Sequence, residues 1–215
     1  MAELIRGLEA SVVARNLERV REEIAGTGRD PADVELLAAV KYVAPEEIGV
    51  LAEAGIRVMG ENRAQDLEVK ARAHPDVTWD FIGHLQSRKV KQVLPYVRFL
   101  HSVATDSVLG QLERHGTPET EVLVEVNVAR EEGKSGVDPD ELDAFVERSP
   151  VRVVGLMTMP PLAQRPEDSR RWFAALAELA AARGLRHLSM GTSQDYLVAV
   201  QEGATIVRLG TTLYR

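Results

Sequence analysis

A lysine closes an apolar stretch in the first quarter of the chain. The segment "VELLAAVKYVAP" covers residues 34–45, and Lys41 follows a run that has the composition of a buried strand. Burial disfavours the ammonium form of such a lysine and lowers its pKa. The neutral amine is then a nucleophile toward carbonyl groups and can form a Schiff base. Two ordinary alternatives remain open: a side chain that reaches solvent from the strand end, or one paired with Glu61.

A second set of residues near the end of the chain has the character of an anion site. Gly191, Thr192 and Ser193 lead into a predicted helix that begins "QDYLVAV", and Gly210 and Thr211 follow the last apolar run. Backbone amides at a helix start, together with hydroxyl groups, bind phosphate, although ordinary turn chemistry would use the same residues. An amine that faces a phosphate site suits pyridoxal 5′-phosphate (PLP), with the aldehyde at the amine and the phosphate at the amides.

Eight short runs of apolar or β-branched residues must position these groups. They recur roughly every 20–35 residues, which is typical of repeated βα units. Eight such units predict a closed (β/α)8 TIM barrel, an α/β fold whose functional residues lie at the carboxyl ends of the strands. The runs cover residues 34–40, 56–60, 79–83, 97–103, 121–128, 151–159, 185–191 and 204–210.

Helical segments separate these runs and also precede them. Residues 1–26 predict an additional amphipathic N-terminal helix, with apolar residues at Ile5, Leu8, Val12, Leu17, Val20 and Ile24. We expect one barrel domain over residues 1–215. The alternative is an open doubly wound sheet, although no G-x-G-x-x-G motif follows the first run. Further helices are predicted at 45–55, 87–97, 106–116, 138–149 and 166–184.

Composition narrows the classes of function. A net charge of −7 argues against a nucleic acid or an anionic membrane as a partner. The chain has no cysteine, which excludes a thiol nucleophile and a cysteine-ligated zinc. His84 and His101 lack metal-ligand spacing, so we expect no metal. No apolar run is long enough to span a membrane, and charges interrupt the N-terminus too often for a signal peptide, so we expect a cytoplasmic protein.

Seven segments, in order and spacing, resemble the pyridoxal phosphate homeostasis proteins, which are single-domain relatives of alanine racemase. They are "AAVKY", "GENRAQD", "FIGHLQSRKVK", "VEVNVAREEGKSGV", "GLMTMPP", "LSMGTSQD" and "VRLGTTLY". The resemblance begins near residue 10 and continues to the end of the chain. It implies a barrel that carries PLP at its open end.

The resemblance also implies roles for individual residues. Lys41 would form the Schiff base, and Ser193, Gly210 and Thr211 would hold the phosphate. Arg208 would face the pyridine nitrogen and keep it unprotonated, which makes the ring a poorer electron sink. Asn62 and His84 would lie near the ring. The full predicted set of cofactor-binding residues is Lys41, Asn62, His84, Met157, Ser193, Arg208, Gly210 and Thr211.

Two departures from the family pattern lie beside these anchors. Val40 and Tyr42 flank the lysine where the family usually has serine and threonine, and Thr192 stands where the family often has methionine. These departures affect the expected packing around the cofactor ring and the affinity for the cofactor, whereas the residues that anchor the cofactor are unchanged.

Two functions from different classes remain. The first is a monomeric PLP carrier with no catalytic residue, which acts in PLP homeostasis and has apo-forms of PLP enzymes as recipients. The second is a PLP-dependent racemase or another Schiff-base enzyme, and a cofactor-free barrel aldolase is a third possibility. Racemisation needs acid–base groups on both faces of the substrate carbon. Tyr42 is expected to point away from Lys41 by strand alternation, so we favour the carrier.

Overall fold

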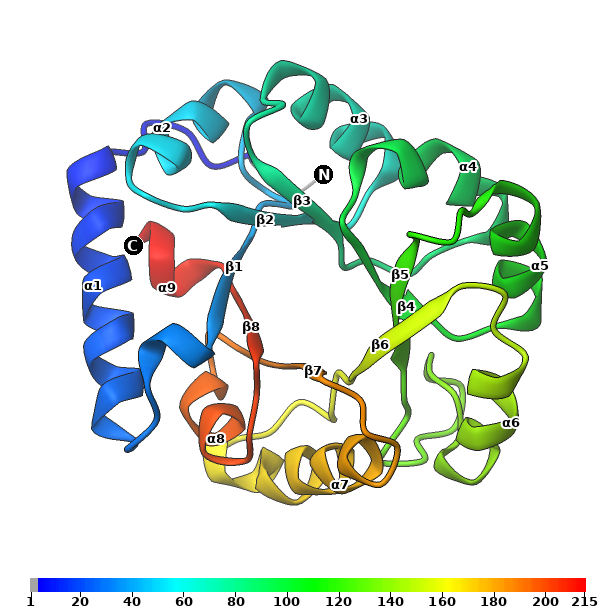
Figure 1. Cartoon of the computed structure of the whole chain (residues 1–215). Coiled ribbons are helices and arrows are strands. Elements are labelled where there is room, and N and C mark those ends of the chain that lie inside the picture. Colours follow the sequence, from blue (N-terminus) through cyan, green and yellow to red (C-terminus); the bar gives the residue numbers. More distant parts are fainter. Residues whose placement is uncertain (1–3) are drawn as a thin grey trace.

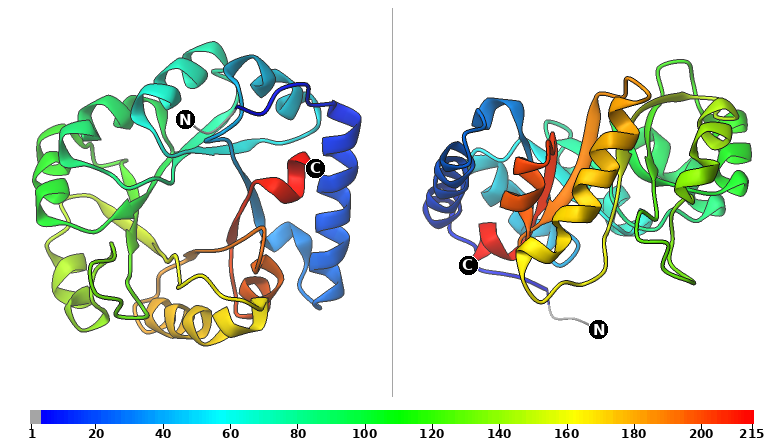
Figure 2. Two further views of the ribbon diagram at one scale, coloured as in Figure 1. Left: turned by 180° about the vertical axis from the view of Figure 1, so that it is seen from behind. Right: turned by 90° about the horizontal axis from the view of Figure 1, so that it is seen from below.

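The computed structural model describes residues 4–215 and contains a closed barrel of parallel strands in the order β1 to β8. Helices surround the barrel (Figure 1, Figure 2). Because β8 pairs with β1, with Ala38 opposite Leu209, the predicted (β/α)8 barrel is confirmed and the open sheet is wrong. The strands are β1 (Glu35–Ala39), β2 (Val58–Glu61), β3 (Thr78–Phe81), β4 (Phe99–Val103), β5 (Glu121–Glu125), β6 (Arg152–Met157), β7 (His187–Thr192) and β8 (Ile206–Leu209).

The helices follow the predicted segments with three differences, at the N-terminus, after β2 and after β8, where a short helix was not predicted. None of the helices in residues 4–215 is long and apolar enough to cross a membrane. The helices are α1 (Ala10–Gly26), α2 (Ile48–Glu53), α3 (Ala64–Ala73), α4 (Val90–Val93), α5 (Asp106–His115), α6 (Leu142–Glu147), α7 (Arg170–Ala181), α8 (Tyr196–Gln201) and α9 (Thr211–Tyr214).

The additional N-terminal helix is confirmed, but it begins at Ala10, so the prediction that it includes Ile5 and Leu8 is wrong. The backbone of Ile5 instead pairs with the turn after β1, donating to the Tyr42 carbonyl at 2.6 Å and accepting from the Ala44 amide at 3.1 Å. Gly7 has a φ of 70°, which breaks a helical path and which glycine tolerates well. Residues 1–3 of the predicted helix lie outside the described residues.

Helix α3 was not predicted from the sequence. Its buried residues are Ala64, Leu67, Lys70 and Ala71. The lysine interrupts the apolar side of the pattern, which is the signal used to recognise an amphipathic helix. Buried lysines are rare unless they are paired, so this position indicates a buried partner for Lys70.

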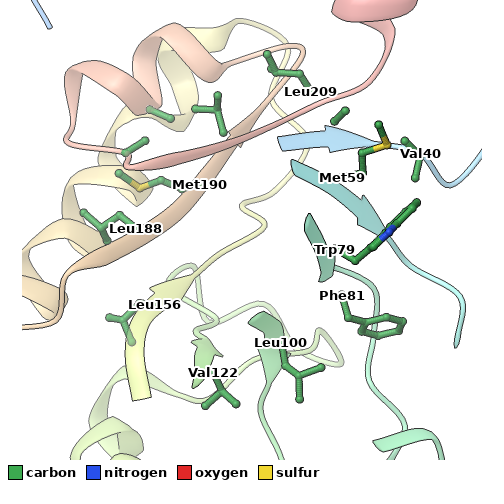
Figure 3. Packing of buried hydrophobic residues seen from close by; sticks show 14 of the residues in the cluster. Val40, Met59, Trp79, Phe81, Leu100, Val122, Leu156, Leu188, Met190 and Leu209 are labelled. Atoms are coloured by element: carbon green, nitrogen blue, oxygen red, sulfur yellow. The ribbon is translucent and has the colours of Figure 1, made fainter. Parts of the chain in front are cut away.

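The core has two layers, because alternate residues of each strand face opposite sides of the barrel wall. The outer layer packs strand residues such as Met59, Leu100 and Leu156 against the surrounding helices (Figure 3). The inner layer fills the barrel with six buried side chains, Leu37, Val58, Phe99, Leu123, Met157 and Ile206. Buried polar residues on the strands, among them Asp80, His101, Ser189 and Arg208, add to these layers.

We expect the inner layer to contribute strongly to stability. Leu37→Ala, at a side chain that is 0% exposed, should lower the free energy of unfolding by about 2–5 kcal/mol because it leaves a cavity. Leu162→Ala is the matched control at a side chain that is 85% exposed, and its effect should be within about 0.5 kcal/mol. Urea unfolding followed by circular dichroism measures both, and equal effects would contradict the assignment of Leu37 to the core.

Candidate functional site

Lys41 lies in the turn after β1, two residues beyond Ala39. Its side chain is half-buried, so it is partly shielded from solvent and partly exposed to it. Its Nζ lies 4.9 Å from the centroid of the Tyr42 ring. The prediction that Tyr42 points away from Lys41 is therefore wrong, because the strand ends before these residues and its alternation does not continue into the turn.

The alternative pairing of Lys41 with Glu61 is wrong as well, because Glu61 forms a buried ion pair with Lys70. The Lys70 Nζ lies 2.6 Å from Glu61 Oε2, and the two side chains are 3% and 0% exposed. Lys70 comes from the buried side of α3, and Glu61 is the last residue of β2. Glu61 is thus occupied, which leaves the amine of Lys41 without this partner.

The same ion pair holds the backbone on both sides of the site. Lys70 Nζ donates to the Val40 carbonyl at 2.7 Å, immediately before Lys41. Glu61 Oε1 accepts from the backbone amides of Asn62 at 2.7 Å and Arg63 at 3.2 Å. Charge-assisted hydrogen bonds of this kind are stronger than neutral ones. One pair therefore fixes the turns that carry Lys41 and Asn62.

The C-terminal helix α9 fastens the end of β1 from the other side. Tyr214 Oη donates to the Ala39 carbonyl at 3.0 Å. Burial, with a contribution from the charge of Glu61, raises the pKa of Tyr214 above its usual range, so the phenol keeps its proton. Helix α9 lies between α1 and the barrel (Figure 1), and Asn16 Nδ2 of α1 donates to the Leu213 carbonyl at 3.1 Å. The N-terminal helix thus supports the site through α9.

The predicted phosphate residues come together after β7 and β8. Ser193 Oγ accepts from the backbone amides of Gly210 at 3.1 Å and Thr212 at 3.3 Å. The threonine whose amide binds Ser193 is therefore Thr212, whereas Thr211, which begins α9, has an exposed side chain. The Thr192 hydroxyl is already bound to Asp195 Oδ1 at 3.1 Å.

The sequence predicted these amides opposite the lysine, whereas in the structure they lie beside the end of β1. β8 pairs directly with β1. A Cβ atom on Gly210 would lie 3.8 Å from the Ala39 carbonyl oxygen. Lys41 and the amides that follow β8 are therefore carried by neighbouring strands.

Arg208 of β8 is a second buried cation of the site, with 6% of its surface exposed. Its Nη1 donates to the Ser189 carbonyl at 2.7 Å and to Ser189 Oγ at 2.6 Å, and its Nη2 donates to the Thr158 carbonyl at 2.9 Å. Burial lowers the pKa of Arg208 to about 10, although Glu125 and Asp195 oppose the shift. The guanidinium is therefore still charged at neutral pH.

The remaining predicted residues differ in their surroundings. Asn62 Oδ1 is buried and has no hydrogen-bond partner within the described part of the chain. Met157 belongs to the inner layer of the core at the end of β6. His84 follows β3 and has an exposed side chain. Within residues 4–215, no three histidine, aspartate or glutamate side chains form a group that could hold a metal ion.

Comparison with known proteins places the chain in a family. Residues 9–215 match the model of the alanine racemase N-terminal domain. The pyridoxal phosphate homeostasis protein of Aquifex aeolicus is 40% identical, and the match covers 94% of this chain and 95% of that protein. The protein of the same name from Pseudomonas aeruginosa is 37% identical, covering 95% and 94%. The chain belongs to the pyridoxal phosphate homeostasis proteins.

Solved structures agree with this family. PipY of Synechococcus elongatus, solved without PLP, is 31% identical with a TM-score of 0.80, and the match covers 94% of this chain and all of PipY. The PLP-bound structure of PipY gives a TM-score of 0.78 over the same coverage. Alanine racemase of Bacillus anthracis shares the fold at 17% identity, with a TM-score of 0.70 over 99% of this chain and 59% of the racemase.

Several residues that shape the site in this family member were missed from the sequence. Lys70 was missed together with α3, although a lysine three residues after Leu67 on an apolar helical face was a usable signal. Tyr214 gave no signal, because its partner is a backbone carbonyl far away in the chain. The hydrogen bond between Ser189 and Arg208 joins two strands, and no local sequence pattern indicates it.

Loss of one partner of the Glu61–Lys70 pair should destabilise both the fold and the turn that carries Lys41. We expect Lys70→Met to lower the free energy of unfolding by about 3–5 kcal/mol, because it leaves a buried carboxylate unpaired. Hydrogen exchange of the Val43 amide, which donates to the Val40 carbonyl, should also accelerate. Lys91→Met, at an exposed lysine of α4, is the control, and a Lys70→Met protein as stable as this control would contradict the role of the pair.

Proposed function

We propose that the chain binds PLP reversibly at the carboxyl end of its barrel and acts in PLP homeostasis without catalysis of its own. The observation that carries the proposal is the arrangement of β1 and β8. Lys41 follows β1, with Glu61 taken by Lys70. The Gly210 and Thr212 amides follow the neighbouring strand β8, and Ser193, to which both donate, follows β7. The names of the relatives and the PLP-bound structure of PipY support the same ligand.

The donors of the site fit the chemistry of the cofactor. Bound PLP supplies an aldehyde that condenses with a primary amine, for which Lys41 is the candidate. The Ser193 hydroxyl and the amides that it now occupies are donors suited to a phosphate, with Gly210 and Thr211 at the start of α9. Asn62 offers a buried amide oxygen that has no hydrogen-bond partner among residues 4–215.

Arg208 is the residue proposed to face the ring of the cofactor. A guanidinium has no acceptor atom and keeps its proton at neutral pH. Placed toward the pyridine nitrogen, it would donate a hydrogen bond and keep that nitrogen unprotonated, which would make the ring a weaker electron sink. Met157 and His84 are the further candidate cofactor-binding residues. Action as a monomer and release to apo-forms of PLP enzymes complete the proposal.

One observation favours the alternative of a PLP-dependent racemase. Tyr42 lies on the same side of the turn as Lys41, with its ring 4.9 Å from Nζ. A phenol near the Schiff-base lysine is a second group able to transfer protons. The racemase therefore stays a second candidate.

The anchoring residue is tested by replacing Lys41. With added PLP, the parent protein should show the absorbance band of a PLP–lysine Schiff base, and borohydride should fix the cofactor covalently to Lys41. We expect Lys41→Ala to lose the band and the labelling at this position, because no amine remains there. Lys91→Ala, which removes an exposed lysine of α4, should keep both. A Lys41→Ala protein with an unchanged spectrum and normal uptake of PLP would show that the anchor lies elsewhere.

The two candidate functions separate in a test of optical purity. PLP-loaded protein incubated with single-enantiomer alanine, serine or lysine should lose optical activity no faster than a solution of free PLP, since a carrier provides no pair of proton-transfer groups. Chiral chromatography of the amino acids measures this. Rapid racemisation that falls in Tyr42→Phe would instead establish the racemase and identify Tyr42 as one of its acid–base groups.

A further inference from the structure

A chain of buried polar side chains runs from Arg208 through the interior of the barrel. Ser189 Oγ accepts from Arg208 Nη1 at 2.6 Å and lies 2.9 Å from His101 Nδ1. His101 Nε2 lies 3.1 Å from Asp80 Oδ2. Asp80, His101 and Ser189 are each 0% exposed. These residues come from β3, β4 and β7, so they connect separate strands across the barrel.

The donors and acceptors of this chain determine which ring nitrogen of His101 carries the proton. Arg208 can only donate, so Ser189 Oγ accepts from it. The hydroxyl proton of Ser189 is then free to donate to His101 Nδ1. His101 Nε2 carries its proton toward the carboxylate of Asp80. With this tautomer, every member of the chain has a partner, which buried polar groups require.

Both carboxylate oxygens of Asp80 have hydrogen-bond donors other than His101. Its Oδ1 accepts from Arg98 Nε at 3.1 Å and from the Phe99 amide at 3.2 Å, and its Oδ2 accepts from Arg98 Nη2 at 2.6 Å. Burial alone would raise the pKa of Asp80, but hydrogen bonds from His101 and Arg98 and the charge of Arg98 lower it. Arg98 is bound in turn by both oxygens of Glu35. The contact that His101 alone provides is therefore the one to Ser189.

We propose that His101 is a positioning residue that, through the hydroxyl of Ser189, fixes the orientation of the Arg208 guanidinium beneath the mouth of the barrel. The imidazole Nδ1 accepts a hydrogen bond from the Ser189 hydroxyl. This directs the hydroxyl hydrogen toward His101 and a lone pair of Ser189 Oγ toward Arg208. The importance of this arrangement for the cofactor rests on the proposed function, in which Arg208 faces the ring of PLP. The positioning itself is a property of the cofactor-free protein.

Two substitutions of His101 separate positioning from a structural role, because each keeps one end of the imidazole. Asparagine places a polar atom near the position of Nδ1 and retains the contact to Ser189. Glutamine places one near the position of Nε2 and retains only the contact to Asp80. We expect the Arg208 guanidinium to rotate more freely in His101→Gln and to stay as restricted as in the parent protein in His101→Asn. If His101 served only to bind Asp80, the order would be reversed.

The measurement is nitrogen-15 NMR of the arginine side chains in the cofactor-free protein. In the parent, rotation about the Cζ–Nη bonds of Arg208 should be slow. It should become about ten-fold faster in His101→Gln and Ser189→Ala, since one hydrogen bond to a charged group is worth about 1.4 kcal/mol or more. His187→Gln is the control, because His187 of β7 packs against Phe99 with ring centroids 5.2 Å apart and lies outside the chain of contacts to Arg208. Parent-like rotation in both His101→Gln and Ser189→Ala, or release in His101→Asn alone, would overturn the proposal.

PLP binding then tests the proposed function separately. Variants that release Arg208 should shift the absorbance maximum of bound PLP in the same direction as Arg208→Lys, and the effects of Ser189→Ala and Arg208→Lys should not add. If the rotation rate of the Arg208 guanidinium changes while the absorbance maximum of bound PLP does not, the positioning role of His101 is supported. The proposed contact between Arg208 and the ring is then wrong. If rotation does not change, the positioning is wrong whatever the protein does with PLP.

Discussion

The buried ion pair between Glu61 and Lys70 is the interaction on which the geometry of the site depends. Desolvating two charges is costly, and the cost is offset only where the geometry is good and the remaining donors and acceptors are satisfied. Here Lys70 also binds the Val40 carbonyl, and Glu61 also binds the amides of Asn62 and Arg63. The pair thus joins α3 to the ends of β1 and β2. It also takes the carboxylate that would otherwise be available to Lys41.

The barrel combines an apolar filling with a polar network. Six apolar side chains from β1, β2, β4, β5, β6 and β8 form the inner layer. The network of Arg98, Asp80, His101, Ser189 and Arg208 crosses between strands in the same interior. Partly satisfied buried networks are costly, whereas satisfied ones specify a single arrangement. The network therefore places a charged guanidinium near the mouth with a defined direction.

Local patterns in the sequence predicted most of the fold but not the whole set of contacts. Eight apolar runs identified the eight strands, since near-continuous burial is typical of parallel strands covered on both faces. Helix α3 was missed because Lys70 breaks its apolar pattern. The N-terminal helix begins later than predicted, at Ala10, because Ile5 pairs with the backbone beyond β1. Tyr42 was placed on the wrong side of Lys41, because β1 ends at Ala39 and the rule of alternation no longer applies in the turn.

The sequence by itself determined the closed barrel, the lysine that follows its first strand and the small and hydroxyl residues that follow its last two. These features depend on residue type and on spacing along the chain. Only the tertiary structure decided that Lys70 takes Glu61, that Thr212 and Gly210 share Ser193, and that Arg208 is held by Ser189. Each of these contacts joins different elements or loops of the barrel. Their partners are set by the closure of the sheet and by the direction of each side chain, which no local pattern contains.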